Sequence, residues 1–166
     1  MISKETAETL VDRWAYDCSK FIRTHDDSFV LASVKKDWST RRKCHRGGWY
    51  AKGAGINMAM YLLFNCYRLA EPVMRFMEYP SFNNHSVIGG FYYTDVNLKA
   101  QTMVCHEMAH AWQFHDAKKN NTRFAPHGVE FKQHYATLRK KFINHKVENQ
   151  EKLLAIYSRD LPKQYV

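Results

Sequence analysis

The sequence predicts one α+β domain over residues 1–166, in which a small antiparallel sheet packs against helices. Two patterns predict this fold class. Apolar residues recur at helical spacing in separate stretches near the start, in the middle and at the end of the chain. Between them lie shorter stretches that are rich in β-forming residues and glycine. At 166 residues the chain is long enough to bury one modest core.

The first half of the chain is expected to hold one helix, two strands and a second helix. Thr6–Arg23 places apolar side chains at helical spacing between charged ones. Phe29–Trp38 and Gly48–Met60 favour strands, and two glycines would bend the second strand. Met60–Met77 favours a helix that is interrupted or restarted near Pro72, because proline does not fit inside a helix.

The second half is expected to be mainly helical. Tyr79–Ser86, with a proline and two asparagines, predicts a loop, and Val87–Thr94 predicts a short strand or an extended segment. A helix from about residue 98 to Asp116 or shortly after follows. Phe131–Phe142 and Val147–Arg159 then favour two further helices.

The most informative motif lies in the middle helix, where Cys105–Trp112 reads CHEMAHAW. His106 and His110 are four residues apart, so they lie one above the other on one helix face and can bind one metal ion together. Glu107 lies beside that face, where its carboxylate can act as the general base on a water at the metal. Cys105 precedes a ligand but points elsewhere, and we interpret it as a packing residue.

A hydrolytic zinc site has three protein ligands and one position for water. The candidates for the third ligand are His115, His127, Glu130 and His134. His115 follows on the same helix, but at a spacing that turns it away from the ligand face. The metzincin motif is excluded, because Asp116 stands where that motif has its third histidine.

Spacing leaves two of these candidates open. The polar segment 117–123 predicts a turn, and Pro126 fits the first turn of a new helix. His127 would begin that helix and could reach the metal, whereas His134 would lie two turns further on. Glu130 is 20 residues after His110, a separation that an enzyme with a glutamate ligand could also use.

HEMAHAW, a short polar loop and then PHGVEF together resemble the SprT-like metallopeptidases, the group that includes bacterial SprT proteins and eukaryotic Spartan. The likeness extends over about Val30 to Phe142. It implies a zincin-like, minimal gluzincin-like core, one Zn²⁺ ion as cofactor, and His127 of the HGxxF element as the third ligand. The segment Tyr61–Ser86 is longer than the resemblance leads us to expect, and no CxxC pair is present for the zinc ribbon of many bacterial members.

Composition and the lack of certain motifs argue against several other classes of protein. Four widely spaced cysteines suggest neither a disulfide framework nor a zinc ribbon, and the zinc deaminase motif H-x-E is absent. The charged N-terminal segment is unlike a signal peptide, and no apolar run approaches the length of a membrane span. We therefore expect a soluble intracellular protein, located in the cytoplasm or the nucleoid.

The net charge of +9 favours contact with a polyanion. The densest basic segment also contains aromatic residues, a combination that can hold single-stranded nucleic acid by phosphate contacts and base stacking. Its candidate nucleic-acid-binding residues are Lys35, Lys36, Trp38, Arg41, Arg42, Lys43 and Arg46. The alternatives are a basic face that only favours solubility and, for Trp38, a place in the core.

Three functions remain open. The first is a zinc metalloendopeptidase, with Glu107 as general base and His106, His110 and His127 as ligands, that cleaves proteins bound or crosslinked to nucleic acid, such as single-stranded DNA. The second is a zinc protease whose substrate is unrelated to nucleic acid. The third is a non-catalytic nucleic-acid-binding module stabilised by zinc, which would have no use for Glu107. In either protease, an edge strand at 48–52 or 87–93 could hold an extended peptide.

Overall fold

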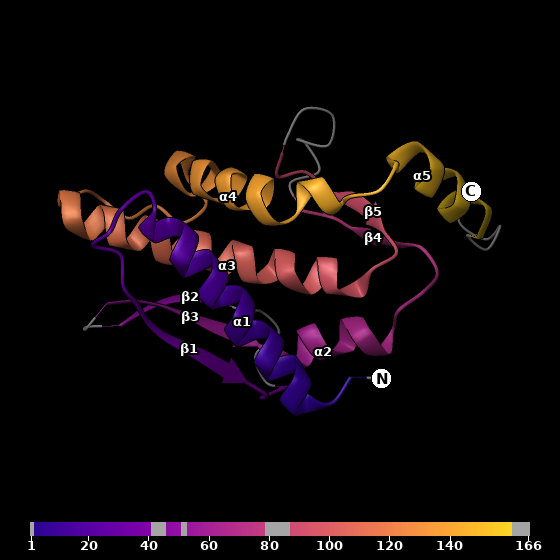
Figure 1. The fold of residues 1–166 in the computed structure, drawn as a ribbon, viewed down its shortest axis with the longest axis horizontal. Coiled ribbons are helices and arrows are strands. Elements are labelled where there is room, and N and C mark those ends of the chain that lie inside the picture. The colour runs from indigo at the N-terminus through magenta and orange to yellow at the C-terminus, as the bar shows by residue number, and fades with distance from the viewer. Residues whose placement is uncertain (1, 41–45, 51–52, 79–86, 161–166) are drawn as a thin grey trace.

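The computed structural model describes residues 2–40, 46–50, 53–78 and 87–160 (Figure 1). The helices are α1 (Lys4–Arg23), α2 (Met60–Arg68), α3 (Val96–Asn120), α4 (Val129–Phe142) and α5 (Gln150–Asp160). The strands are β1 (Leu31–Asp37), β2 (Arg46–Tyr50), β3 (Gly53–Ala59), β4 (Met74–Phe76) and β5 (Phe91–Tyr93), and a short 3₁₀ turn covers Asn144–Lys146. The predicted α+β class is therefore confirmed. Within the described ranges, no helix combines the length and the apolar character needed to cross a membrane.

The main sheet is mixed, so the prediction of an antiparallel sheet is wrong for one of its two strand pairs. The strands lie in the order β1-β3-β2. β2 and β3 are antiparallel, whereas β1 and β3 are parallel. The segment predicted as one bent strand, Gly48–Met60, instead contributes to two strands, β2 and β3. β3 is the central strand of the sheet, and β1 and β2 are its edges.

A second, two-stranded sheet forms where the sequence predicted the end of a helix. α2 ends at Arg68, and the segment around Pro72 leads into β4, which pairs antiparallel with β5. The short strand expected within 87–94 is confirmed as β5. The expected continuation of the helix to Met77 is wrong, because the backbone of residues 74–76 pairs with β5 instead.

α3 is the central element of the fold. In Figure 1 it runs through the middle of the molecule, between the main sheet and α4, with α1 crossing it. Its N-cap is Asp95, whose side chain accepts a hydrogen bond from Asn97 N–H, and its C-cap is Asn121, which has a positive φ of 52°. The helix therefore ends shortly after Asp116, as expected. Because sheet and helices enclose it, α3 buries residues on all sides rather than along one stripe.

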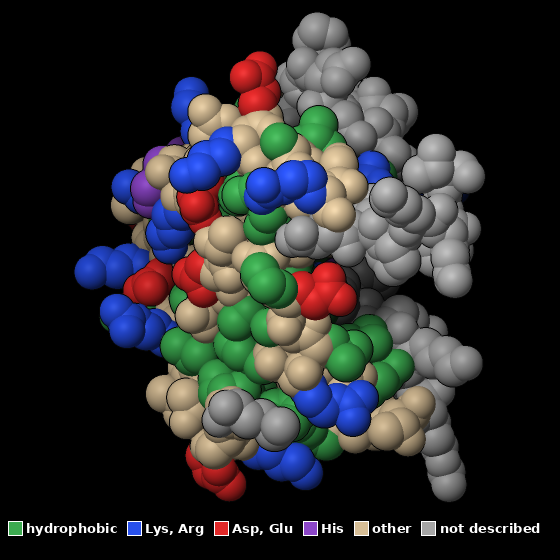
Figure 2. All heavy atoms as spheres, turned by 90° about the vertical axis from the view of Figure 1, so that its right-hand side faces the viewer, with side chains coloured by type: hydrophobic (Ala, Val, Ile, Leu, Met, Phe, Trp, Pro, Cys, Tyr) green, Lys and Arg blue, Asp and Glu red, His purple; other side chains and the backbone are tan. Residues whose placement is uncertain are grey.

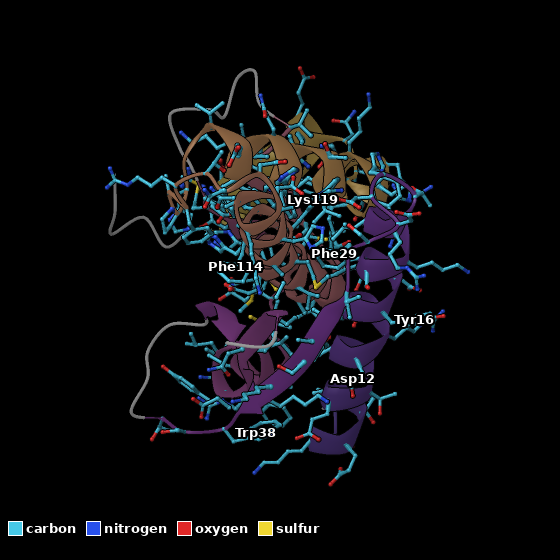
Figure 3. All side chains as sticks on the ribbon, turned by 90° about the vertical axis from the view of Figure 1, so that its left-hand side faces the viewer. Asp12, Tyr16, Phe29, Trp38, Phe114 and Lys119 are labelled. Carbon is cyan, nitrogen blue, oxygen red and sulfur yellow. The ribbon has the colours of Figure 1, made fainter. Side chains whose placement is uncertain are left out.

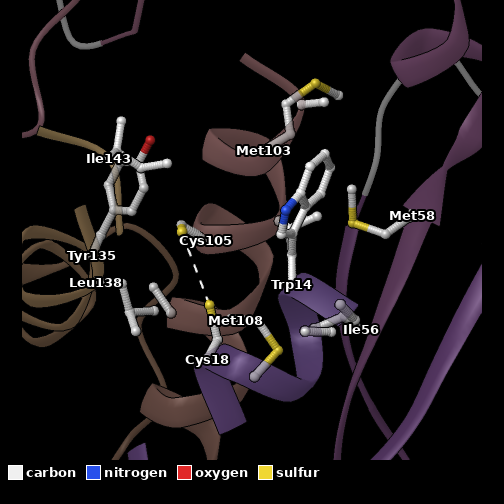
Figure 4. Packing of buried hydrophobic residues seen from close by; sticks show 14 of the residues in the cluster. Trp14, Cys18, Ile56, Met58, Met103, Cys105, Met108, Tyr135, Leu138 and Ile143 are labelled. Carbon is white, nitrogen blue, oxygen red and sulfur yellow. Dashed lines mark hydrogen bonds between the residues drawn. The ribbon is translucent and has the colours of Figure 1, made fainter. Parts of the chain in front are cut away.

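The core lies between α1, α3 and β3 (Figure 4). Trp14 of α1, Ile56 and Met58 of β3 and Met108 of α3 are all buried there. Cys105 is completely buried, and its Sγ lies 4.0 Å from Sγ of Cys18 on α1. This agrees with its interpretation as a packing residue, and the dense packing holds the motif helix rigidly.

Candidate metal centre

The two motif histidines lie on one face of α3, as their spacing requires. Their ring centroids are 5.0 Å apart. His110 is buried, and the side chain of His106 is only 12% exposed. Because α3 is packed on all sides, both imidazoles have little freedom to turn away from each other.

His127 reaches the same place from the loop between α3 and α4. It lies two residues before α4, whose N-cap is Gly128, so the expectation that Pro126 and His127 belong to the first helical turn is wrong. His127 has φ 59°, a left-handed conformation that costs about 1–2 kcal/mol in a residue with a Cβ. This conformation ends the loop tightly and turns the imidazole towards α3.

Two contacts hold this loop in place. The buried Gln113 of α3 donates from Nε2 to the carbonyl of Ala125 at 2.8 Å. The same carbonyl accepts the N–H of Gly128 at 3.0 Å. A Cβ at Gly128 would lie 3.0 Å from that carbonyl oxygen, which explains the glycine directly after His127. Sequence reasoning did not identify Gln113, because nothing in its spacing marks it as a loop anchor.

The three imidazoles converge through their Nε2 atoms. Nε2 of His127 lies 3.2 Å from Nε2 of His106 and 3.0 Å from Nε2 of His110. Two nitrogens bound to zinc at about 2.0–2.1 Å in a tetrahedral site lie roughly 3.3 Å apart. The spacing of the three nitrogens therefore fits one shared metal ion, and His106, His110 and His127 form a cluster that could hold one.

Phe131 supports all three imidazoles from α4. It is completely buried and stacks on His110 with a centroid distance of 4.2 Å. Its ring also lies 4.9 Å from the rings of His106 and His127. The last residue of the HGxxF element thus forms the apolar floor of the cluster.

Electrostatics favour a neutral imidazole at His127. Burial lowers the pKa of His127, and the neighbouring His106 lowers it further, while the negative charges of Glu107 and Glu78 partly oppose the shift. A neutral imidazole is the form that binds a metal, because its unprotonated nitrogen offers a lone pair. Glu107 is itself buried, at 1% exposure, so a carboxylate lies next to the cluster in a water-poor environment.

Glu78 is a further residue of the site, and sequence reasoning missed it. Its Oε1 lies 2.5 Å from Nδ1 of His106, on the side of the ring away from the cluster. Burial raises the pKa of Glu78, but the hydrogen bonds from His106 and Tyr135 and the positive charges of His106 and Arg139 outweigh it and lower the pKa overall. No spacing rule connects Glu78 with a motif 28 residues later, so only the tertiary structure identifies it.

Two other carboxylates near the motif in sequence, those of Asp116 and Glu130, are not part of the histidine cluster. Oδ2 of Asp116 pairs with Nε2 of His134 at 2.9 Å. Glu130 is exposed on α4, outside the histidine cluster. Tyr135 of α4 is buried and donates its hydroxyl to Glu78 at 2.5 Å.

His115 and His134 do not join the cluster. The ring of His134 stacks on Trp112 with a centroid distance of 4.1 Å. His115 lies 3.1 Å from Oδ2 of Asp26, which also accepts Nζ of Lys119 at 2.8 Å. Asp26, His115 and Asp116 are close enough to suggest a second metal group. The lysine already neutralises Asp26, however, so we interpret this group as an ion-pair network that ties the end of α1 to α3.

Trp38, one of the candidate nucleic-acid-binding residues, follows the far end of β1 and lies well away from Lys119 of this network (Figure 3). Lys36 pairs with Asp12 of α1 at 2.5 Å. Trp38 is half-buried; it donates Nε1–H to Glu8 at 2.6 Å and packs edge-on against Phe64. These contacts favour a structural role for Trp38.

The rest of the basic segment is less informative. Lys35 lies on β1, Arg41, Arg42 and Lys43 fall outside the described residues, and only the backbone of Arg46 is described, as the start of β2. On the face shown in Figure 2, the described Lys and Arg side chains alternate with acidic and apolar ones. The described part of that face therefore carries no continuous basic patch.

No protein-family model, curated protein or solved structure matches this chain. The site must therefore be interpreted from its own chemistry.

Proposed function

We propose that this protein is a zinc-dependent metalloendopeptidase with a zincin-like core of the SprT-like type. The observation that carries the proposal is the convergence of three Nε2 atoms on one point, beside a buried glutamate on the same helix. Three imidazoles form a donor set that suits zinc and leaves one coordination position open. The HExxH segment on α3 and the HGxxF segment before and in α4 contribute these three histidines, and their resemblance to the SprT-like motifs supports the SprT-like assignment.

A zinc ion held by His106, His110 and His127 would supply a Lewis acid that polarises a peptide carbonyl and lowers the pKa of a water molecule. Glu107 would take a proton from the attacking water as general base and then deliver it to the leaving amine. Its burial keeps bulk water away from the carboxylate and so strengthens its interaction with the reacting groups.

An extended peptide would bind along β2. This strand forms an edge of the main sheet and packs on α3, so its outer backbone groups are placed to pair with a substrate strand near the site. β5, the other candidate, is less suitable. Gln150 of α5 accepts the N–H of Tyr92 at 2.7 Å and donates to its carbonyl at 2.9 Å, so a side chain already occupies that edge.

The substrates would be proteins bound or crosslinked to nucleic acid, single-stranded DNA in particular. The net charge of +9 and the basic segment around β1 and β2 support this choice. A second candidate is a zinc protease whose substrate is unrelated to nucleic acid. The contacts of Trp38 and Lys36 within the protein favour that reading, since both side chains already have partners.

The test combines metal analysis with proteolysis. The purified protein should bind one zinc ion, and His127→Ala should lose it, whereas the matched His115→Ala variant should keep it. Glu107→Gln should keep zinc and fold but lose cleavage of casein or histones by about 10²–10⁴-fold or more. Cleavage by zinc-loaded Glu107→Gln at the wild-type rate would refute the catalytic role and leave a structural zinc module.

A second comparison identifies the ligand type and the substrate class. If Glu130→Ala strips zinc and His127→Ala does not, the site is of the glutamate-ligand type and the SprT-like assignment is wrong. Stimulation of histone cleavage by single-stranded DNA supports a substrate on nucleic acid. Equal rates with and without DNA favour the second candidate.

A further inference from the structure

A continuous chain of buried polar groups leads from His106 to the second sheet. Glu78, which follows β4, contacts Nδ1 of His106 with Oε1 and accepts the hydroxyl of Tyr135 on Oε2, each at 2.5 Å. Both carboxylate oxygens are thus occupied, one by a cluster histidine and one by α4. The Tyr135 hydroxyl also accepts a hydrogen bond from Nη1 of Arg139 at 3.2 Å.

Arg139 extends this chain to β5. It is only 2% exposed, which is rare for an arginine and requires that its donors find partners. Its Nη2 donates to the carbonyl of Gly89 at 3.1 Å, and its guanidinium lies 5.1 Å from the ring centroid of Phe91. Asn144 adds a bond from Nδ2 to the carbonyl of Val87 at 3.1 Å.

These contacts mean that both strands of the second sheet are held on α4 near the histidine cluster. Glu78 lies two residues after the end of β4, and Gly89 lies two residues before the start of β5. The two strands pair with each other through Met74–Phe76 and Phe91–Tyr93. The carboxylate of Glu78 is the point where this assembly meets the cluster.

We propose that Glu78 is a positioning residue for His106, and that the chain Glu78–Tyr135–Arg139 couples metal binding to the docking of the β4–β5 sheet on α4. This inference rests on the proposed function, because it takes His106, His110 and His127 as the ligands.

The physical reason lies in the two nitrogens of the imidazole. A carboxylate at Nδ1 holds the proton on that nitrogen, so Nε2 keeps the lone pair that faces the cluster. It also fixes the rotation of the ring and makes Nε2 a stronger donor to a metal. In return, a cation at Nε2 makes the Nδ1 proton a better hydrogen-bond donor to Glu78, so the bond that holds the second sheet becomes stronger when the metal is present.

The first experiment measures zinc affinity by competition with a chromophoric chelator. Glu78→Gln preserves the size of the side chain but removes its charge, and it should weaken zinc binding by about 10–100-fold. The matched control is Glu130→Gln, which removes the same charge from an exposed position on α4 and should leave the affinity within about threefold. Tyr135→Phe removes one support of Glu78 and provides a second variant if Glu78→Gln does not fold; it should also weaken zinc binding.

Two spectroscopic measurements separate positioning from general stability. In the zinc-loaded wild type, NMR should show the His106 Nδ1 proton shifted downfield by a carboxylate acceptor, and this shift should be lost in Glu78→Gln. Hydrogen exchange of the wild type should become faster at Phe91–Tyr93 when zinc is removed by a chelator. Amides of residues 11–18 in α1, a helix that packs on α3 and has no hydrogen bond to Glu78, Tyr135 or Arg139, should change much less.

The outcomes distinguish this inference from the proposed function. If wild-type protein binds no zinc, or if His127→Ala binds it as tightly as wild type does, the proposed function fails together with the inference. If the histidine variants lose zinc but Glu78→Gln binds it as tightly as wild type, only the role of Glu78 is refuted. Equal exchange at Phe91–Tyr93 with and without zinc would refute the coupling to the second sheet.

Discussion

Substitution of Phe131 tests whether packing from α4 orients the three imidazoles of the histidine cluster. Its completely buried ring stacks on His110 and touches the rings of His106 and His127. Truncation of a buried phenylalanine to alanine costs about 3–5 kcal/mol, because apolar contacts are lost and a cavity remains. For a protein of this length, that loss lowers the Tm by roughly 6–20 °C. We expect Phe131→Ala to show this loss in the zinc-free protein and, in addition, to weaken zinc binding.

The matched control is Phe29→Ala. Phe29 is also completely buried, but its ring packs on His115 and not on the histidine cluster. The two variants should therefore lose similar stability in urea unfolding of the zinc-free protein. At a temperature where both are folded, chelator competition should show weaker zinc binding for Phe131→Ala alone. Equal zinc affinities of the two variants would refute the idea that Phe131 orients the ligands.

Three further predictions concern the surface. Hydrogen bonds from lysine and serine lower the pKa of Asp26, so its carboxylate stabilises the fold above the ordinary aspartate pKa of about 4, and this contribution is lost as the pH falls further. The Tm of Asp26→Asn should thus lie below that of wild type at pH 7, and the gap should narrow below about pH 4; a gap independent of pH would contradict the ion-pair network. Trp38→Ala should lower stability by about 2 kcal/mol in urea unfolding, less than for a fully buried aromatic residue, and unchanged stability together with weaker DNA binding would instead indicate base stacking. Neutralising Arg41, Arg42 and Lys43 should reduce the slope of log affinity for single-stranded DNA against log salt by about 2, because each phosphate contact contributes ~0.7. Cleavage of a free peptide should stay unchanged. An unaltered slope would mean that the basic segment serves solubility and does not bind DNA.

The motif on α3 could be predicted because it depends on one helix alone. His106 and His110 share a face through the period of the α-helix, and the apolar residues around them predict that helix without reference to the rest of the chain. The strand at β5 and the helix α1 were likewise predicted from local patterns. For the helices, the hydrogen bonds that define the element join residues close in sequence, whereas β5 is predicted from its residue types alone and its pairing with β4 is not.

The third histidine of the cluster could be predicted only in part from the sequence. Spacing after His110 left His127 and Glu130 open, and the resemblance in HGxxF favoured His127. The decisive features are tertiary: a positive φ at His127 and the anchoring of the Ala125 carbonyl by Gln113. The left-handed conformation, which few residues other than glycine adopt, cannot be inferred from the presence of a histidine.

The sequence by itself determined the α+β class, the motif helix and the chemistry of the imidazole and carboxylate groups, because these follow from local periodicity and residue type. Only the tertiary structure decided that β3 lies between β1 and β2, that α2 ends at Arg68, and that Glu78 supports His106. Strand order and the Glu78 contact join residues far apart in the chain, and the packing of the whole core selects them. The pattern of residues within one segment does not indicate which distant segment it will contact in the folded protein.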